Sequence, residues 1–261
     1  MIAVLIAGAV SMVLSLSGTR ALISFFDSIG KGQPILGSDD HGPVHHMKKQ
    51  GTATMGGIAI MVSAFIGWGA AHLRGGIALS DQAMIMWAIC GVLSVIGFLD
   101  DYLKVHRAQN RGIFWKKKGY ITFGLVVVMM TWLLLGTGVS ETLSFTRFDF
   151  PGWQLSPVLW VVWTSLMVWA TTNAVNVTDG LDGLAAGSAL FGFLAFTVIA
   201  YWAFRNPDIY NLVNPLDLAV FSAAMAGACG GFLWWNAAPA RIFMGDVGAL
   251  GIGAALGLLA V

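Results

Sequence analysis

Apolar runs of about twenty residues recur along the whole chain, and this feature limits the folds that the sequence can adopt. The core of a lipid bilayer is crossed by about 20 apolar residues in a helix, and a spanning segment must satisfy its own backbone hydrogen bonds. Only 10% of the 261 residues are charged, whereas an ordinary soluble domain has about 25%. The sequence therefore predicts an all-α, polytopic transmembrane protein in a lipid bilayer.

Eight apolar spans are expected, and no separate soluble domain stands out between them. Their approximate ranges are 1–26, 53–73, 80–99, 120–138, 156–174, 185–204, 216–235 and 247–261. The last range has only 15 residues, fewer than the roughly 20 needed to cross, and the sequence stops inside it. We therefore expect residues 1–261 to be one membrane domain that is truncated at its C-terminus.

Lysine and arginine are distributed unevenly between the two sets of loops. One set, counted with Arg20, holds eleven of these residues and the other holds three. The richer set consists of loops 27–52, 100–119, 173–184 and 236–246. Because basic loops stay in the cytoplasm, we predict that this set is cytoplasmic and that the N-terminus lies outside. The net charge of +1 and a run of three lysines give no indication of nucleic-acid binding.

Carboxylates stand at the cytoplasmic ends of two spans. Asp100 and Asp101 are adjacent where one span ends, and Asp246 precedes the last span. A carboxylate at a membrane boundary is costly unless it is paired or binds a cation, and Mg²⁺ prefers oxygen ligands. Two simpler roles stay open, because Lys104 could pair with the first two carboxylates within one helix and Asp246 could cap a helix.

The stretch NAVNVTDGLDGLAAG, residues 173–187, has polar side chains at every third position. These residues are Asn173, Asn176, Asp179 and Asp182. A straight helix would rotate the stripe by about 60° per step, so one narrow helix face cannot hold all four. The glycines that follow instead indicate a helix end and a loop whose side chains converge on a cavity. A channel vestibule or a structural polar cluster is the alternative.

Two further loops carry features that suit phosphate and a flat ring. Residues 45–57, HHMKKQGTATMGG, run from basic residues into a Gly/Thr-rich turn, and backbone N–H groups with lysine favour bound phosphate. A basic loop with a glycine cap would look the same. In residues 236–251, Phe243 could stack on a base. Taken together, the four loops predict a metal site with basic phosphate contacts at the membrane face.

These stretches, in this order, resemble the polyprenyl-phosphate N-acetylhexosamine-1-phosphate transferases. The motifs are GQPI, KKQGTATMGG, GFLDDYLK, NAVNVTDGLDGLAAG and FMGDVGALGIG, which lie between residues 32 and 253. The second and fourth together resemble the muramoyl branch of the family. Two departures are Ala53, where the family usually has proline, and a histidine-rich cytoplasmic loop of the family that this sequence lacks.

The resemblance implies transfer of phospho-MurNAc-pentapeptide from UDP-MurNAc-pentapeptide to undecaprenyl phosphate, with Mg²⁺ and release of UMP. It implies a bacterial plasma membrane protein of ten spans, with both termini outside and the active site on the cytoplasmic face, and a homodimer would suit such an enzyme. Asp246 would be the foremost metal ligand, with Asp100 and Asp101 beside the metal and the lipid phosphate, either of them able to deprotonate that phosphate. The implied substrate-binding residues are Lys49, Thr54, Lys116, Asn173, Asn176, Asp179, Asp182, Asn236 and Phe243.

Three other functions are alternatives to this transfer reaction. A sister transferase that loads GlcNAc-1-phosphate would share the metal chemistry. A transporter or channel would use the carboxylates as an ion path, but transporters bind near the membrane midplane, whereas these carboxylates are at loop ends. A structural scaffold leaves the aspartates unexplained. The residues also leave open whether transfer is direct or passes through an aspartyl-phosphate.

Overall fold

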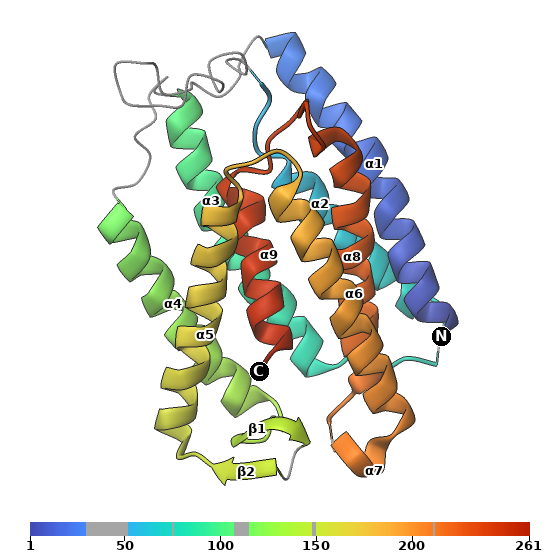
Figure 1. Ribbon diagram of the computed structural model, residues 1–261, viewed down its shortest axis with the longest axis vertical. Coiled ribbons are helices and arrows are strands. Elements are labelled where there is room, and N and C mark those ends of the chain that lie inside the picture. The colour runs from blue at the N-terminus through green and yellow to red at the C-terminus, as the bar shows by residue number, and fades with distance from the viewer. Residues whose placement is uncertain (30–51, 75, 107–114, 148–149, 211) are drawn as a thin grey trace.

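The computed structural model describes residues 1–29, 52–74, 76–106, 115–147, 150–210 and 212–261 (Figure 1). The helices and strands, in chain order, are α1 (Ile2–Ile29), α2 (Gly57–His72), α3 (Asp81–His106), α4 (Trp115–Gly136), β1 (Thr142–Arg147), β2 (Phe150–Gln154), α5 (Pro157–Thr178), α6 (Leu184–Arg205), α7 (Pro207–Tyr210), α8 (Pro215–Asn236) and α9 (Gly245–Leu259). The predicted all-α polytopic architecture is confirmed, and each of the eight predicted spans corresponds to a helix.

The helices fall into a long group and a short group. Six helices of the described ranges, α1, α3, α4, α5, α6 and α8, are long and apolar enough to cross a membrane. Helix α2 has 16 residues and α9 has 15. The span predicted at 53–73 therefore starts too early, because residues 53–56 lie outside the helix.

Residues 53–57 instead pair with the segment that leads into α9. Ala53 and Ile242 form a parallel bridge, and the Phe243 N–H donates to the Ala53 carbonyl at 2.8 Å. The Gly56 and Gly57 N–H groups donate to the carbonyls of Phe243 and Met244, each at 2.9 Å. This pairing satisfies backbone groups that would otherwise be buried without a partner, and it brings the starts of two short helices together.

Glycines allow the helices to approach one another closely. A Cβ atom on Gly227 of α8 would lie 2.1 Å from the Gly8 carbonyl oxygen of α1. A Cβ on Gly57 of α2 would lie 2.1 Å from the Gly248 nitrogen of α9. Contacts of this kind suit helices in lipid, where small residues let backbones approach.

Helix α9 packs against α3 and α5 inside the bundle, and Figure 1 shows it at the centre of the molecule. A Cβ on Gly253 would lie 2.5 Å from the Thr172 Cα atom of α5, and one on Gly257 would lie 2.9 Å from the Val168 Cα atom. The four-residue spacing of these glycines therefore serves helix packing. The antiparallel β1–β2 hairpin, which the sequence did not predict, lies at the far end of the bundle from the start of α9 (Figure 1).

Candidate active site

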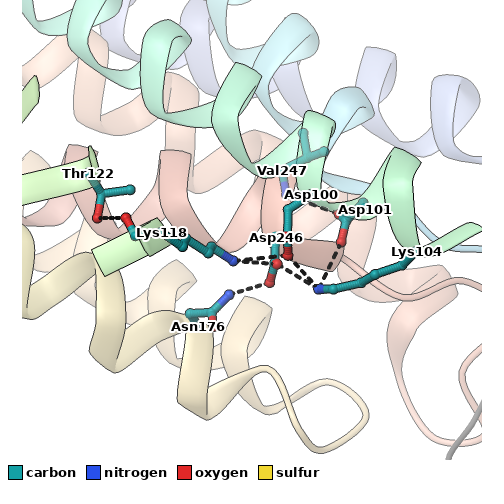
Figure 2. Close-up of polar contacts among 8 residues, drawn as sticks. All are labelled: Asp100, Asp101, Lys104, Lys118, Thr122, Asn176, Asp246 and Val247. Carbon is teal, nitrogen blue, oxygen red and sulfur yellow. Dashed lines mark hydrogen bonds and ion pairs between the residues drawn. The ribbon is translucent and has the colours of Figure 1, made fainter. Parts of the chain in front are cut away.

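Three carboxylates converge where the last turns of α3 meet the first turn of α9. Among the described residues, Asp100, Asp101 and Asp246 form a group whose candidate ligand oxygens all lie within 4.8 Å of one another. Asp100 is 2% exposed and Asp101 is 5% exposed. Figure 2 shows the three carboxylates grouped around the Lys104 ammonium group. The three carboxylates that the sequence singled out at 100, 101 and 246 therefore lie together in three dimensions.

Two lysine ammonium groups offset the charge of this cluster. The Lys104 Nζ lies 2.8 Å from Asp100 Oδ2 and 2.7 Å from Asp246 Oδ2. The Lys118 Nζ lies 3.3 Å from Asp100 Oδ2 and also contacts Asp246 Oδ2 (Figure 2). Buried carboxylates are stable only when cations or hydrogen bonds compensate the lost hydration, so these lysines make the carboxylate cluster tolerable inside the bundle.

Helix α5 contributes an amide from its last turn. The Asn176 Nδ2 donates to Asp246 Oδ1 (Figure 2). Asp246 is therefore held from three elements, by Lys104 of α3, Lys118 of α4 and Asn176 of α5. The side-chain oxygen of Asn176 is a further atom of the type that coordinates hard metal ions.

Close backbone contact between α3 and α9 makes this convergence possible. A Cβ on Gly97 would lie 2.2 Å from the Asp246 carbonyl oxygen, so a larger residue would push α9 away. Gly245 has φ of +73°, a conformation that favours glycine. These glycines place the Asp246 side chain next to the end of α3.

Asp179 follows α5 and faces the same cluster. Burial, followed by repulsion from Asp246, raises the pKa of Asp179 to about 8, although the Gly245 N–H donates a hydrogen bond to it and works in the opposite direction. Repulsion from Asp246 and Asp101 adds to the effect of burial, so Asp179 lies within the electrostatic field of the cluster.

Asp182 and Asn236 connect two loops next to the cluster. Asp182 Oδ2 accepts the Ala240 N–H at 3.1 Å. Asn236 Oδ1 accepts the Gly183 N–H at 3.0 Å, and its Nδ2 donates to the Ile242 carbonyl at 2.9 Å. The turn after α5 and the loop before α9 are thus joined by the side chains of Asp182 and Asn236, for which the resemblance implies a role in substrate binding.

The remaining predicted residues lie at different distances from the centre. Thr54 is buried on the segment that pairs with residues 242–244, and Phe243 lies half-buried on the partner segment. Asn173 is exposed and its Nδ2 donates to the Trp169 carbonyl of its own helix. Lys116 is exposed at the start of α4, and Lys49 lies outside the described residues.

Lys104 and Lys118 are site residues that sequence reasoning missed. The three- and four-residue spacings indicated Lys104 only as a partner of Asp100 and Asp101 within one helix, and not as a contact of Asp246. No local signal distinguishes Lys118 from its two lysine neighbours. Its direction depends on α4 packing, where the Trp169 indole of α5 donates to the Gly119 carbonyl at 3.2 Å.

The donor set fits a hard divalent cation. Three carboxylates and an amide oxygen are the ligand types of Mg²⁺ and Ca²⁺, and they come from elements fixed by packing. Two ammonium groups beside them suit phosphate oxygens. The fold and site thus define a polytopic membrane protein with a buried, acidic and lysine-lined polar site at one end of its helices.

Comparison with known proteins identifies the family. Residues 82–261 match the sequence profile of glycosyl transferase family 4, and the chain belongs to this family. It is 39% identical over 274 residues to a phospho-N-acetylmuramoyl-pentapeptide-transferase of Streptomyces griseus. The aligned region covers 99% of this chain and 76% of that relative. It is 40% identical over 275 residues to the protein of that name from Mycobacterium tuberculosis, with the same coverage of both chains. The resemblance predicted from the motifs is therefore confirmed.

Proposed function

We propose that the protein transfers phospho-MurNAc-pentapeptide from UDP-MurNAc-pentapeptide to undecaprenyl phosphate and releases UMP. This reaction is supported by relatives that match nearly the whole chain and are named phospho-N-acetylmuramoyl-pentapeptide-transferase. The observation that carries the proposal is the convergence of Asp100, Asp101 and Asp246 with Lys104 and Lys118 at the end of a membrane helix bundle. It offers ligands for a metal and cations for a diphosphate in one place.

The charge balance of the cluster supports phosphate chemistry. Three carboxylates face two ammonium groups in the structure. A bound Mg²⁺ would polarise the diphosphate and offset the charge that develops on it. Asp246 would be the foremost ligand of that cation, with Asp100 and Asp101 beside it. Lys104 and Lys118 would then be released from the carboxylates to contact phosphate oxygens, which is where a positioned cation stabilises the transition state.

The transfer exchanges one phosphate–oxygen bond for another. An oxygen of the lipid phosphate attacks the phosphorus that carries the sugar, and the bond from that phosphorus to the UMP oxygen breaks. The lipid diphosphate and UMP are the products, and one of the cluster carboxylates accepts any proton carried by the attacking phosphate. Lys104 and Lys118 hold the two reacting phosphates in line. Their positive charges offset the repulsion between these phosphates and the buried carboxylates.

The nucleotide would lie over the turn that joins α5 and α6. Asn173, Asn176, Asp179 and Asp182 are on this turn or the helix before it, and Asn236 and Phe243 flank the loop tied to it. The Phe243 ring would stack on uracil. Lys49, Thr54 and Lys116 would contact the nucleotide or its phosphates.

The predicted membrane orientation places this end of the bundle in the cytoplasm. Single cysteines in place of Lys116, at the site end, and Gly138, at the other end, test it in intact cells after Cys90 and Cys229 are replaced. A membrane-impermeant thiol reagent should label the cysteine at 138 and spare the one at 116. The reverse pattern would overturn the orientation.

The reaction is tested by UMP release from the purified protein in detergent with Mg²⁺ and undecaprenyl phosphate. UMP should appear with UDP-MurNAc-pentapeptide and be absent with UDP-GlcNAc. Release from UDP-GlcNAc alone would assign the chain to the sister transferases. Mg²⁺-independent release, or equal release by the Asp246→Asn variant, would contradict the metal-centred site.

A further inference from the structure

The three carboxylates of the site do not have equivalent contacts. Asp100 and Asp246 each share the ammonium groups of Lys104 and Lys118. Asp101 lies farther from Lys104, at 3.7 Å through Oδ1. Its Oδ2 accepts the backbone N–H of Val247 at 3.2 Å instead (Figure 2). One carboxylate of the cluster is thus directed at the backbone of another helix.

Helix α9 needs such a partner, because it begins without a cap of its own. Its N-cap position is Met244, which makes no side-chain cap hydrogen bond. The first N–H groups of a helix have no partner inside the helix, and a carboxylate is favoured at that end. Asp101 supplies the missing acceptor for Val247, and Asp179 accepts the Gly245 N–H next to it.

The backbone around the contact is shaped to admit the Asp101 side chain. Gly245 has positive φ, and a Cβ there would lie 2.4 Å from Asp101 Oδ2. Gly97 is one helical turn before Asp101, and a Cβ there would lie 2.2 Å from the Asp246 carbonyl oxygen. Any larger residue at either position would push the carboxylate and the start of α9 apart.

We propose that Asp101 is a positioning residue that caps α9 from a neighbouring helix and so fixes where Asp246 enters the site. The cap holds Val247, the residue that follows Asp246, while Asp100 and Asp246 keep the contacts with the two lysines. Its importance for turnover rests on the proposed function, whereas the cap itself does not. An acceptor atom at residue 101 is what the cap needs, and a negative charge there is secondary.

The decisive experiment compares Asp101→Asn, which keeps an acceptor oxygen, with Asp101→Leu, which has similar size and none. Hydrogen exchange of the full protein is followed in peptides that cover residues 244–250. We expect exchange at least tenfold faster than wild type in the leucine variant and within threefold in the asparagine variant. Asp81→Leu, an exposed position on the same helix, is the matched control and should exchange like wild type.

Turnover gives the second measurement. The leucine variant should lose at least a thousandfold in UMP release, and asparagine should restore a large part, to about a tenfold loss. Equal loss in both variants, with wild-type exchange at 244–250, would overturn the proposal and give Asp101 a role through its charge. If the two variants differ in exchange as expected but the wild-type protein releases no UMP, the cap stands and the proposed function fails.

Gly245→Ala keeps Asp101 and tests the same contact if the leucine variant does not fold. The methyl group would lie too close to Asp101 Oδ2 and push it away, so exchange should again rise at 244–250 and turnover should fall. Wild-type exchange and turnover in the alanine variant would also contradict the cap. Gly91→Ala on α3, where a Cβ would have no neighbour within 4 Å, is the control.

Discussion

Each end of the helix bundle buries aspartate within a polar cluster, and the two clusters are built differently. At one end Asp100 and Asp246 are held by the ammonium groups of Lys104 and Lys118. At the other end, where α8 begins, Asp217 is 1% exposed and is held by groups on rigid frames. The comparison separates a carboxylate cluster that we propose binds a metal from a carboxylate that supports the fold.

Asp217 has its hydrogen-bonding capacity filled by three neighbours. Its Oδ1 accepts the Trp68 indole N–H at 2.7 Å and lies 3.3 Å from the His72 Nε2. Its Oδ2 accepts the Ser80 N–H at 3.0 Å and the Ser80 hydroxyl at 2.7 Å. These contacts join the end of α2, the start of α3 and the start of α8, so the cluster ties three helices together.

The partners explain the difference in role. An indole, a backbone N–H and a short hydroxyl cannot move away without unfolding the region around them. Lysine ammonium groups sit on flexible stems and can turn from a carboxylate to a phosphate. We therefore expect the cluster at the site end to exchange partners when a phosphate binds, whereas the hydrogen bonds of Asp217 are complete without a ligand.

The largest expected effect is on turnover at the site end. Asp246→Asn removes a charged metal ligand and should lower UMP release about a thousandfold or more, while the melting temperature stays near that of wild type. The same substitution at Asp217 is the control and should keep turnover per folded molecule within threefold. Near-wild-type turnover of Asp246→Asn would erase the functional half of the comparison.

The second effect is on stability at the other end. Asp217→Leu leaves the Trp68 indole and the Ser80 donors buried without an acceptor, which should lower the free energy of unfolding by about 3 kcal/mol. Thermal unfolding in detergent measures it, with the exposed Asp81→Leu as control. An unchanged melting temperature would show that the Asp217 cluster does not hold the three helices together.

The third effect separates neighbouring lysines of α4. Lys118→Met removes a cation that touches Asp100 and Asp246, so kcat should fall by about tenfold to a hundredfold. Lys117→Met changes an exposed lysine and should have an effect of less than about threefold. Equal effects of the two substitutions would contradict the orientation of α4 that directs Lys118 inward.

The smallest effect is a pH dependence from Asp179. Its pKa is raised to about 8 from about 4 in an unfolded chain, so the folded state holds the proton more tightly. Without divalent cations, the free energy of unfolding should therefore fall as pH rises from about 4 to 8. Asp179→Asn lacks this loss and should melt higher than wild type at pH 9 and closer to it at pH 5. An equal difference at both pH values would contradict the raised pKa.

The sequence predicted the helices and the main carboxylates because both signals are local. Hydropathy over twenty residues is set by the segment itself, and Asp100, Asp101 and Asp246 stood at span ends on one predicted side. The pairing of residues 53–57 with 242–244 depends on contacts across the bundle, so hydropathy extended the second span too far. The inward direction of Lys118 has the same origin.

The sequence did not indicate the buried contacts of Asp217, for a different physical reason. A single aspartate in the first turn of a span is an ordinary helix start, favoured by the helix dipole. Its partners Trp68, His72 and Ser80 come from residues far away in the sequence and include one aromatic ring that hydropathy counts as apolar. Only the packed structure shows that their polar atoms meet at one buried carboxylate.

The most direct test of the account is metal binding at the two ends of the molecule. Mn²⁺ is titrated into the purified protein and followed by electron paramagnetic resonance, with wild type, Asp246→Asn and Asp217→Asn measured side by side. We predict one Mn²⁺ per chain that Mg²⁺ displaces, lost in Asp246→Asn and retained in Asp217→Asn. Unchanged Mn²⁺ binding in Asp246→Asn would contradict the central claim that this carboxylate cluster is the metal-binding site.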